Sequence, residues 1–294
     1  MFALVSGLGS EEWGPVHRFA ESQRIPQLFP NIDIAASPHE GIYSFYFSKG
    51  VILEAQVIAR HLADQVQTAG IKRVVQLHRD GRAGAKAAEA LRSAMNGAMP
   101  VEDRILKHSA PEALSTALSG LAHTDALVVW LDRGELAALD SVPPAEVGQI
   151  VFSGWLSGLD SAPIPPAWKR ASLMVYPVDA PQRRQSRMEF NLRPWLKKHG
   201  IADGDEILLG NSLTACNLLT EGMLRLRGAF SRDYLVELTE NYPTGMGNAP
   251  APEAFPRFVI GPGQRYSSKG AYIVKFNDRD LTKLELVKDW IVPD

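Results

Sequence analysis

Short apolar runs alternate with amphipathic segments along most of the chain, and this alternation predicts repeated strand–helix units. Positions 51, 55, 58 and 62 are apolar, which is the spacing of one helix face, whereas 125–131 are strongly apolar over the length of a strand. The strands predicted in this way span 2–5, 26–29, 43–47, 72–78, 101–107, 125–131, 149–152, 172–176, 257–260, 271–276 and 284–291. The predicted helices span 12–22, 51–62, 83–95, 112–121, 133–139, 182–199, 207–226 and 232–241.

The order of these segments predicts an α/β fold with parallel sheets flanked by helices. Pro194 is a weak point within the predicted helix 182–199, because proline lacks the N–H that a helix interior needs. The composition changes after Tyr242, where 243–256 contains four prolines and two glycines and is expected to be a loop. We expect a first lobe, a second lobe and a β-rich return segment, which span 1–98 with 205–256, 99–204, and 257–294, respectively.

Composition narrows the range of partners. The 294 residues carry a net charge of -2, and the lysines and arginines are scattered, so no nucleic-acid partner is expected. The single cysteine, Cys216, excludes an internal disulfide and a cysteine-based metal cage. No uninterrupted apolar run reaches the roughly 18 residues of a membrane span, and the start lacks the features of a secretory signal. We therefore expect no membrane insertion.

Gly7 and Gly9 stand between a predicted strand and a predicted helix, where a dinucleotide-binding fold places its phosphate loop. Glu12 replaces the third glycine of that pattern, and adjacent carboxylates at the start of a helix oppose a pyrophosphate. Asp33 would be the ribose ligand in this interpretation. Because the glycine pattern is broken, a nucleotide-dependent α/β enzyme is the less favoured hypothesis.

Motifs for other catalytic chemistry are incomplete. The seven histidines are never three to five residues apart, which is the spacing of zinc-type pairs. Ser153 and Gly154 lack the preceding glycine of a serine-hydrolase elbow, and Cys216 sits in an apolar helical stretch that is typical of a small core residue. We expect no catalytic residue, no metal ion and no cofactor.

The two ends of the sequence carry the most specific patterns. The tail contains FVIGPGQRY at 258–266, SKGAYIV at 268–274 and WIVP at 290–293, and the start contains ALVSGLGS at 3–10 and IPQLFP at 25–30. Both ends resemble type I periplasmic binding proteins, most closely the branched-chain amino-acid-binding family. The order of elements between the two ends agrees with that family over essentially the whole chain.

The resemblance implies two α/β lobes joined by a hinge, which 257–294 would cross, with a small molecule held in the cleft between the lobes. It implies the substrate-binding component of an ABC-type importer, which captures an amino-acid-like or carboxylate solute and closes by hinge motion. Such a protein works in the periplasm, where its partner is a membrane permease. A ligand-sensing receptor or regulatory domain of the same fold is the alternative.

Members of this family also have an export signal and about two βα units, on the order of 60 residues, before the strand that begins here at Phe2. The resemblance therefore implies a first lobe that is truncated at its N-terminus. A chain that genuinely starts at Met1 would remain in the cytoplasm.

The resemblance also implies which residues contact the ligand. Gly9 and Ser10 correspond to a first-lobe loop that holds a carboxylate, and Asp33 belongs to the neighbouring loop. In the second lobe, Trp155 stands where the family has an acid, so Asp132 is the remaining partner for an ammonium group. The complete set of expected ligand-binding residues is Leu8, Gly9, Ser10, Asn31, Asp33, Tyr43, Arg82, Asp132 and Trp155.

Three side chains in this set favour different ligands. Trp155 and Tyr43 suit an apolar or aromatic molecule, whereas Arg82 suits an anion. Packing under a loop is the structural alternative for Trp155, and a solvated loop position is the alternative for Arg82. The sequence leaves the identity of the ligand open.

Overall fold

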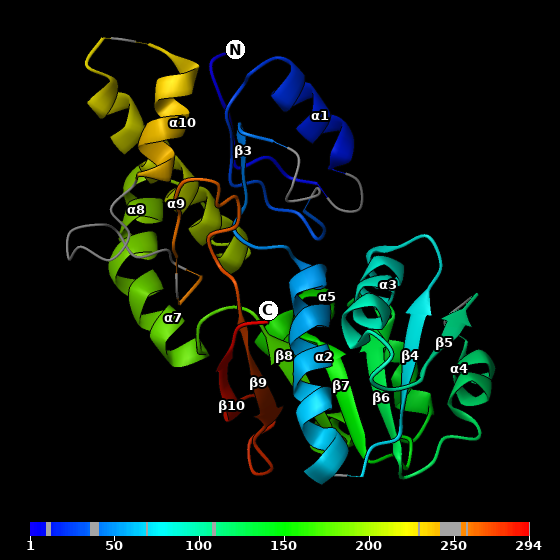
Figure 1. Ribbon diagram of the computed structural model, residues 1–294. Helices are drawn as coiled ribbons and strands as arrows, with labels where there is room; N and C mark the ends of the chain where they lie inside the picture. The colour runs from blue at the N-terminus through cyan, green and yellow to red at the C-terminus, as the bar shows by residue number, and fades with distance from the viewer. Residues whose placement is uncertain are drawn as a thin grey trace. The chain divides into compact units, whose positions relative to one another are not determined.

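The computed structural model describes residues 1–9, 13–35, 41–68, 70–107, 110–228, 230–241, 254–256 and 258–293. The chain forms two compact units, of which Figure 1 traces the elements. Unit 1 consists of Met1–Gly50 and Val178–Lys269, and unit 2 consists of Val51–Pro177 and Gly270–Asp294. The polypeptide therefore passes from one unit to the other after Gly50, Pro177 and Lys269.

Unit 1 contains a small parallel sheet with the strand order β1-β2-β3. Its strands are β1 (Leu4–Val5), β2 (Gln27–Leu28) and β3 (Ser44–Phe45). Its helical segments are α1 (Gly14–Ser22), α7 (Pro181–Arg187), the π-helical turn η3 (Met188–Leu192), α8 (Arg193–His199), α9 (Glu206–Leu226) and α10 (Arg232–Glu240). Met188, Leu192 and Leu196 pack against Leu213, which joins the segment from η3 to α8 to α9.

Unit 2 contains a seven-stranded sheet with the order β10-β9-β8-β7-β6-β4-β5. Its strands are β4 (Arg73–Arg79), β5 (Val101–Leu106), β6 (Asp125–Trp130), β7 (Gln149–Ser153), β8 (Ser172–Tyr176), β9 (Ala271–Phe276) and β10 (Leu284–Ile291). Strands β4 to β8 are parallel, whereas β9 and β10 are added in antiparallel pairs. Its helical segments are α2 (Val51–Thr68), α3 (Ala83–Met95), α4 (Pro111–Leu118), η1 (Leu136–Ser141), α5 (Gly154–Ser157), η2 (Leu159–Ser161) and α6 (Pro166–Ala171).

Helices cover both faces of the seven-stranded sheet. Asp103 and Arg104 are consecutive residues of β5, so their side chains point to opposite faces. Asp103 pairs with Arg92 of α3, while Arg104 donates to the carbonyl of Ala117 in α4 at 2.6 Å. β6 lies in the interior of the sheet and every one of its residues is buried, which explains its nearly uninterrupted apolar sequence.

The structure confirms the predicted α/β architecture and most of its elements. The helix 83–95 and the strands 172–176, 271–276 and 284–291 have the predicted bounds. The strand predicted over 257–260 is wrong, because 258–260 form no strand and a tight turn between Gly261 and Gln264 follows directly. α5 and α6 were not predicted, since segments of four and six residues are too short to show a helical period.

Pro194 does not interrupt the predicted helix 182–199. The helix continues from α7 through the π-helical turn η3 into α8, and Pro194 occupies one of the first positions of α8. A π-helical turn leaves a carbonyl without its usual partner, which matches the N–H that proline lacks.

The two units divide the chain differently from the lobes predicted from the sequence. β4 was assigned to the first lobe within 1–98, yet it pairs with β5 and β6 and belongs to unit 2. The segment 178–204 was assigned to the second lobe, but its helices pack against α9 in unit 1. The return segment also divides, because its part before Gly270 belongs to unit 1 and its part from Gly270 forms β9 and β10 of unit 2.

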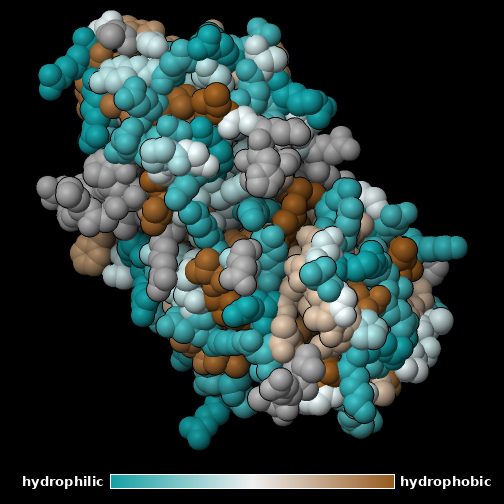
Figure 2. Space-filling view, viewed as in Figure 1, coloured by the Kyte–Doolittle hydropathy of each residue, from teal (hydrophilic) through white to brown (hydrophobic). Residues whose placement is uncertain are grey.

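Some large hydrophobic side chains are exposed, with Phe190, Met1 and Leu8 the most open in unit 1. On the face that Figure 2 shows, hydrophobic residues form small groups separated by hydrophilic ones. Scattered exposure of this kind is ordinary for a protein surface and marks no extended docking face in this view.

Candidate functional site

The carboxyl ends of β1 and β2 bring together three of the expected ligand-binding residues. Leu8 and Asn31 form an isolated parallel bridge. The N–H of Gly9 donates to the carbonyl of Asn31 at 3.1 Å, and the N–H of Asn31 donates to the carbonyl of Gly7 at 2.7 Å. Leu8, Gly9 and Asn31 therefore belong to one local structure at the carboxyl edge of the unit 1 sheet. Ser10 lies outside the described residues.

The side chain of Asn31 ties this edge to α9. Its Nδ2 donates to the hydroxyl of Ser6 at 2.9 Å, and its Oδ1 accepts a hydrogen bond from Nδ2 of Asn211 at 3.0 Å. The hydroxyls of Ser6 and Ser212 are 2.8 Å apart. Both ends of the Asn31 amide thus hold the loop in place. Two adjacent polar residues of α9, Asn211 and Ser212, were the sequence signal for this network.

Trp13 fills the space beside the two glycines that follow β1. A Cβ on Gly7 would lie 2.6 Å from the Trp13 ring, and a Cβ on Gly9 would lie 2.7 Å from it. The indole N–H of Trp13 donates to Oε1 of Gln27 at 2.8 Å. The glycine pair therefore makes room for an aromatic ring, so it has a packing role that the phosphate-loop interpretation did not foresee.

An aromatic cluster that the sequence did not single out follows β3. Tyr46 is buried, its ring stacks on Tyr266 with centroids 5.6 Å apart, and its hydroxyl lies 2.7 Å from Nδ1 of His17. The ammonium of Lys49 lies 5.9 Å from the centre of the Tyr266 ring, and burial lowers the pKa of Lys49. The aromatic run 43–47 was the available signal, because the residue that follows a parallel strand stands at the carboxyl edge.

Tyr43 lies at the opposite edge of the unit 1 sheet. It precedes β3, and its hydroxyl donates to Oδ1 of Asp233 at 2.5 Å and accepts from Nε of Arg24 at 2.6 Å. Burial and the hydrogen bond to Asp233 raise the pKa of Tyr43. Ligands of parallel sheets bind at the carboxyl ends of the strands, so the structure does not bring Tyr43 together with Leu8, Gly9 and Asn31. The hydroxyl of Tyr43 links Arg24 to Asp233 of α10.

Asp33 lies in the loop after β2, on the same side of the sheet as Asn31. Its neighbour Ile34 forms an antiparallel bridge with Gly50. Gly50 has a φ of +63°, and a Cβ at that position would collide with the carbonyl oxygen of Asp33. The backbone of Asp33 is therefore packed against Gly50, the last residue of the segment Met1–Gly50 of unit 1. The side chain of Asp33 is half-buried.

The carboxyl ends of β4 and β6 bring Arg82 and Asp132 together in unit 2. Nη1 of Arg82 lies 3.5 Å from Oδ2 of Asp132, and the two side chains are 50% and 35% exposed. Glu135 supports this loop, because its Oε2 accepts the N–H of Asp132 at 3.1 Å and its Oε1 pairs with Arg79 at 3.0 Å. The edge therefore presents one cation and one anion side by side, within reach of solvent.

Trp155 stands at the end of β7, in the first turn of α5. Its N–H donates to Oε1 of Glu54 at 2.8 Å, and the hydroxyl of Ser153 donates to the other oxygen of the same carboxylate. α5 ends beside the Asp132 loop, since a Cβ on Gly158 would lie 3.3 Å from Cδ of Arg133. The structure thus places Arg82, Asp132 and Trp155 along one edge of the unit 2 sheet.

Glu54 is the principal unit 2 residue that the sequence interpretation missed. It lies on α2 and is fully buried. The signal was present, because position 54 falls on the same helix face as the apolar positions 51, 55, 58 and 62. An acid on an apolar helix face needs internal hydrogen-bond donors, and Ser153 and Trp155 supply them.

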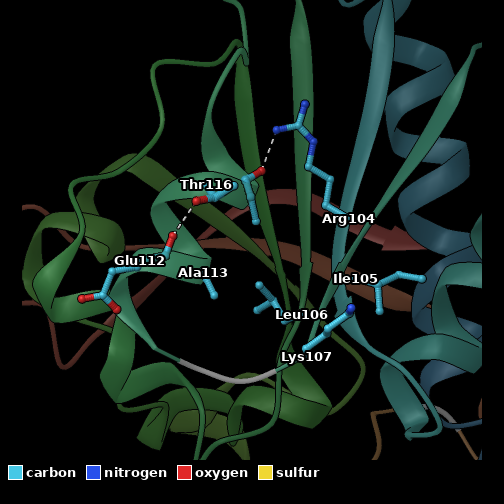
Figure 3. A pocket seen from close by; sticks show the side chains of 8 residues that line it. Arg104, Ile105, Leu106, Lys107, Glu112, Ala113 and Thr116 are labelled. Atoms are coloured by element: carbon cyan, nitrogen blue, oxygen red, sulfur yellow. Dashed lines mark hydrogen bonds between the residues drawn. The ribbon is translucent and has the colours of Figure 1, made fainter.

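A groove of about 510 Å³ lies elsewhere in unit 2, between β5 and α4 (Figure 3). Its lining contains none of the expected ligand-binding residues and consists of Arg104, Ile105, Leu106, Lys107, Glu112, Ala113, Thr116 and Ala117. Arg104 is already engaged there, since it donates to the carbonyls of Ala117 and Ser119 at 2.6 Å each. The groove therefore adds nothing to the candidate site at the strand ends.

Within the described part of the chain, no group of three or more histidine, cysteine, aspartate or glutamate side chains could hold a metal ion. None of the described helices combines the length and apolar character needed to cross a membrane.

No family model matches the sequence, and no curated protein matches it. Solved structures do share its fold. A substrate-binding protein of an ABC transporter from Aeropyrum pernix is similar with a TM-score of 0.68 and 13% identity, over 98% of this chain and 76% of that one. A fatty acid ABC transporter substrate-binding protein from Thermomonospora curvata is similar with a TM-score of 0.66 and 13% identity, over 97% and 73% of the two chains.

A branched-chain amino acid ABC transporter protein from Thermus thermophilus, solved with bound valine, is similar with a TM-score of 0.65 and 13% identity, over 97% of this chain and 77% of that one. Similar structures of this kind are two-lobed type I periplasmic binding proteins. The chain therefore has the type I periplasmic binding protein fold, as the resemblance at its two ends implied.

Proposed function

We propose that the chain is the solute-binding component of an ABC-type importer. It captures a small amino-acid-like or carboxylate solute in the periplasm and delivers this solute to the permease in the membrane. It acts by binding rather than by catalysis. Its fold supports this proposal, because the similar structures are substrate-binding proteins of ABC transporters. The solute contacts come from the loops at the carboxyl ends of the parallel strands in each unit.

The observation that carries the proposal is the pair formed by Arg82 and Asp132, 3.5 Å apart and partly exposed at the carboxyl edge of the unit 2 sheet. A guanidinium binds a solute carboxylate through paired N–H donors, and a carboxylate binds an ammonium group. Because each partner is only loosely held by the other, a solute exchanges one ion pair for another at small cost.

In unit 2 the ring of Trp155 adds an apolar contact beside Arg82 and Asp132. Leu8, Gly9, Asn31 and Asp33 are the candidate contacts at the carboxyl edge of the unit 1 sheet. Tyr43 is not part of this proposal, because it lies at the amino edge of its sheet. A nucleotide-dependent enzyme is the less favoured function, because the Trp13 ring occupies the space beside Gly7 and Gly9.

A thermal-shift panel tests the proposal with L-valine, L-leucine, hexanoate, benzoate, acetamide, ATP and NAD. We expect at least one amino acid or carboxylate to raise the melting temperature, because a ligand at 100 times its Kd adds about 2.7 kcal/mol to the free energy of unfolding. Arg82→Gln should weaken that solute by about tenfold, as expected for the loss of a charge-assisted contact.

Lys86→Gln is the matched control, because Lys86 is an exposed cation on α3 that pairs with the neighbouring Glu89 at 3.2 Å. It should leave the affinity unchanged. A shift with ATP or NAD alone would overturn the binding-protein proposal, and an equal loss in both variants would remove Arg82 from the site.

A further inference from the structure

Glu54 has an unusual position for a charged side chain. It is 0% exposed, on a helix face that otherwise packs into the interior of unit 2. Removing a carboxylate from water is unfavourable unless hydrogen-bond donors replace the lost water. The groups that donate to it therefore indicate what the side chain does.

Two of the groups that donate to Glu54 come from one short stretch of chain. Oε1 of Glu54 accepts the backbone N–H of Trp155 at 2.8 Å, and Oε2 accepts the hydroxyl of Ser153. Ser153 in turn accepts the N–H of Leu156 at 3.1 Å. The first N–H groups of a helix have no partner inside the helix, and here Glu54 and Ser153 provide acceptors for them. The turn from β7 into α5 is thus tied to α2.

The same turn is confined from its other side. Gly154, between Ser153 and Trp155, lies so close to β8 that a Cβ there would collide with the carbonyl oxygen of Val175. Glu54 and the β8 backbone together leave little freedom for the chain at position 154. The ring of Trp155 leaves this turn from a backbone that neighbouring elements hold in place.

We propose that Glu54 is a positioning residue for solute binding, and this inference rests on the proposed function. Glu54 holds the turn so that Trp155 keeps its ring at the carboxyl edge of the sheet. Because the Trp155 N–H already donates to Glu54, it is not available to a solute carboxylate. Trp155 therefore contacts the apolar or aromatic part of the solute with its ring, and Arg82 receives the anionic part.

Fluorine NMR on the full chain labelled with 5-fluorotryptophan tests the positioning role without any solute. The chain has six tryptophans, and Trp155→Phe identifies the resonance of Trp155 by its loss. Glu54→Leu should displace or broaden that resonance and leave the other five unchanged. Glu54→Gln keeps an oxygen that accepts the Trp155 N–H, so the Trp155 resonance should stay close to its position in the unchanged protein. This variant also keeps the proposal testable if Glu54→Leu does not fold.

Asp125→Asn is the matched control, because Asp125 is also a buried carboxylate in unit 2 that accepts a backbone N–H, from Ala122 at 2.9 Å. It lies at the start of β6, whereas Trp155 follows the end of β7, so it should leave the Trp155 resonance in place. An unchanged Trp155 resonance in Glu54→Leu would overturn the proposal, as would an equal displacement in Asp125→Asn.

Titration with L-leucine and hexanoate then connects the position of Trp155 to binding. We expect Glu54→Leu to weaken the bound solute by about tenfold and Glu54→Gln by less than about threefold. Equal affinity in Glu54→Leu and the unchanged protein would overturn the role in binding. If the unchanged protein binds neither of them nor any other solute of the panel, the proposed function fails, while a displaced resonance would still establish Glu54 as a structural anchor of α5.

Discussion

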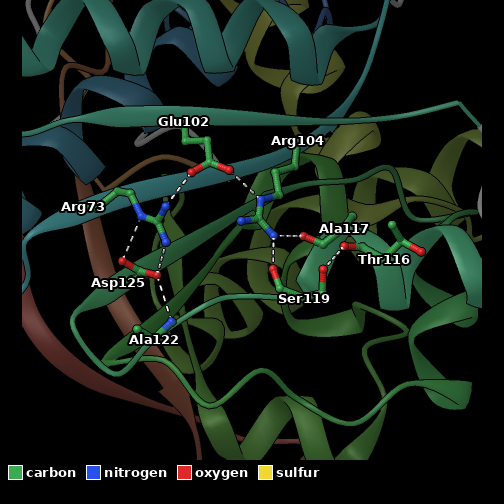
Figure 4. Close-up of polar contacts among 8 residues, drawn as sticks. All are labelled: Arg73, Glu102, Arg104, Thr116, Ala117, Ser119, Ala122 and Asp125. Atoms are coloured by element: carbon green, nitrogen blue, oxygen red, sulfur yellow. Dashed lines mark hydrogen bonds and ion pairs between the residues drawn. The ribbon is translucent and has the colours of Figure 1, made fainter.

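The two edges of the seven-stranded sheet in unit 2 use charged residues in opposite ways. At the amino edge, Arg73 binds Asp125 through two hydrogen bonds of 2.6 and 3.0 Å and Glu102 through a third of 2.7 Å (Figure 4). Glu102 also accepts from Arg104 at 2.9 Å, and the side chain of Asp125 is only 4% exposed. Charges at this edge are joined into a continuous network.

At the carboxyl edge, the pair of Arg82 and Asp132 is looser, at 3.5 Å, and both side chains remain open to solvent. The contrast follows from the geometry of a parallel α/β sheet, in which ligands bind where the strands end. The contacts at the amino edge are 2.6 to 3.0 Å long, whereas Arg82 and Asp132 are 3.5 Å apart. We propose the amino-edge network as structural and the pair of Arg82 and Asp132 as the one that binds a solute.

The largest expected effect is at the amino edge. Asp125→Ala should lower the free energy of unfolding by about 3 kcal/mol, because it leaves a partly buried arginine without its main partner. Urea unfolding measures this change, with Lys86→Ala as an exposed ion-pair control expected to change it by less than about 0.5 kcal/mol. A loss below about 1 kcal/mol would contradict the structural role of this network.

The pKa of Asp125 indicates how the stability of this edge responds to acid. Its hydrogen bond to Arg73 holds the pKa of the Asp125 carboxyl below its ordinary value. A lowered folded-state pKa stabilises the fold above the unfolded pKa, near 3.9, and that contribution is lost as the pH falls through the folded pKa. Acid unfolding of the unchanged protein should therefore include a contribution that Asp125→Ala lacks.

A second, smaller effect at the amino edge concerns His61 of α2. Burial, followed by the charge of Lys288, lowers the pKa of His61, and a hydrogen bond with Gln149 opposes this shift only in part. A base with a lowered folded pKa takes up its proton first in the unfolded state. The free energy of unfolding should then fall as the pH drops below about 6.5, by at most about 1.4 kcal/mol per pH unit.

His61→Leu removes this titration and keeps a side chain of similar size. Urea midpoints between pH 7.5 and pH 5 should vary less for His61→Leu than for the unchanged protein. If the two pH profiles are parallel, His61 takes up its proton to the same extent in the folded and the unfolded state over this range. That result would contradict the prediction.

The smallest effect on stability is expected at the carboxyl edge. A double-mutant cycle of Arg82→Gln and Asp132→Asn should give a coupling energy below about 0.5 kcal/mol for unfolding, because both side chains are substantially exposed. The same substitutions should nevertheless weaken solute binding. A coupling energy above about 1 kcal/mol would make this pair structural and would remove the contrast between the two edges.

Periodicity and composition determined much of the fold. The helix 83–95 and the strands 172–176, 271–276 and 284–291 followed from local pattern, because burial on one face imposes a period that the sequence must show. The alternation of strands and helices fixed the α/β class, and the position of Arg82, Asp132 and Trp155 after predicted strands placed them at a carboxyl edge. These are properties of neighbours along the chain.

Only the tertiary structure decided which sheet each strand joins and what each side chain meets there. β4 has the same apolar pattern in either unit, and its hydrogen bonds with β5 and β6 alone assign it to unit 2. Tyr43 and Tyr46 are three residues apart, yet the strand between them separates an amino-edge link from a carboxyl-edge aromatic cluster. Glu54 meets Trp155 across about a hundred residues of sequence, a contact set by the packing of α2 against α5. Hydrogen bonds and close packing between distant segments leave little trace in local periodicity, and for that reason the fold class was predictable while the partners within the site were not.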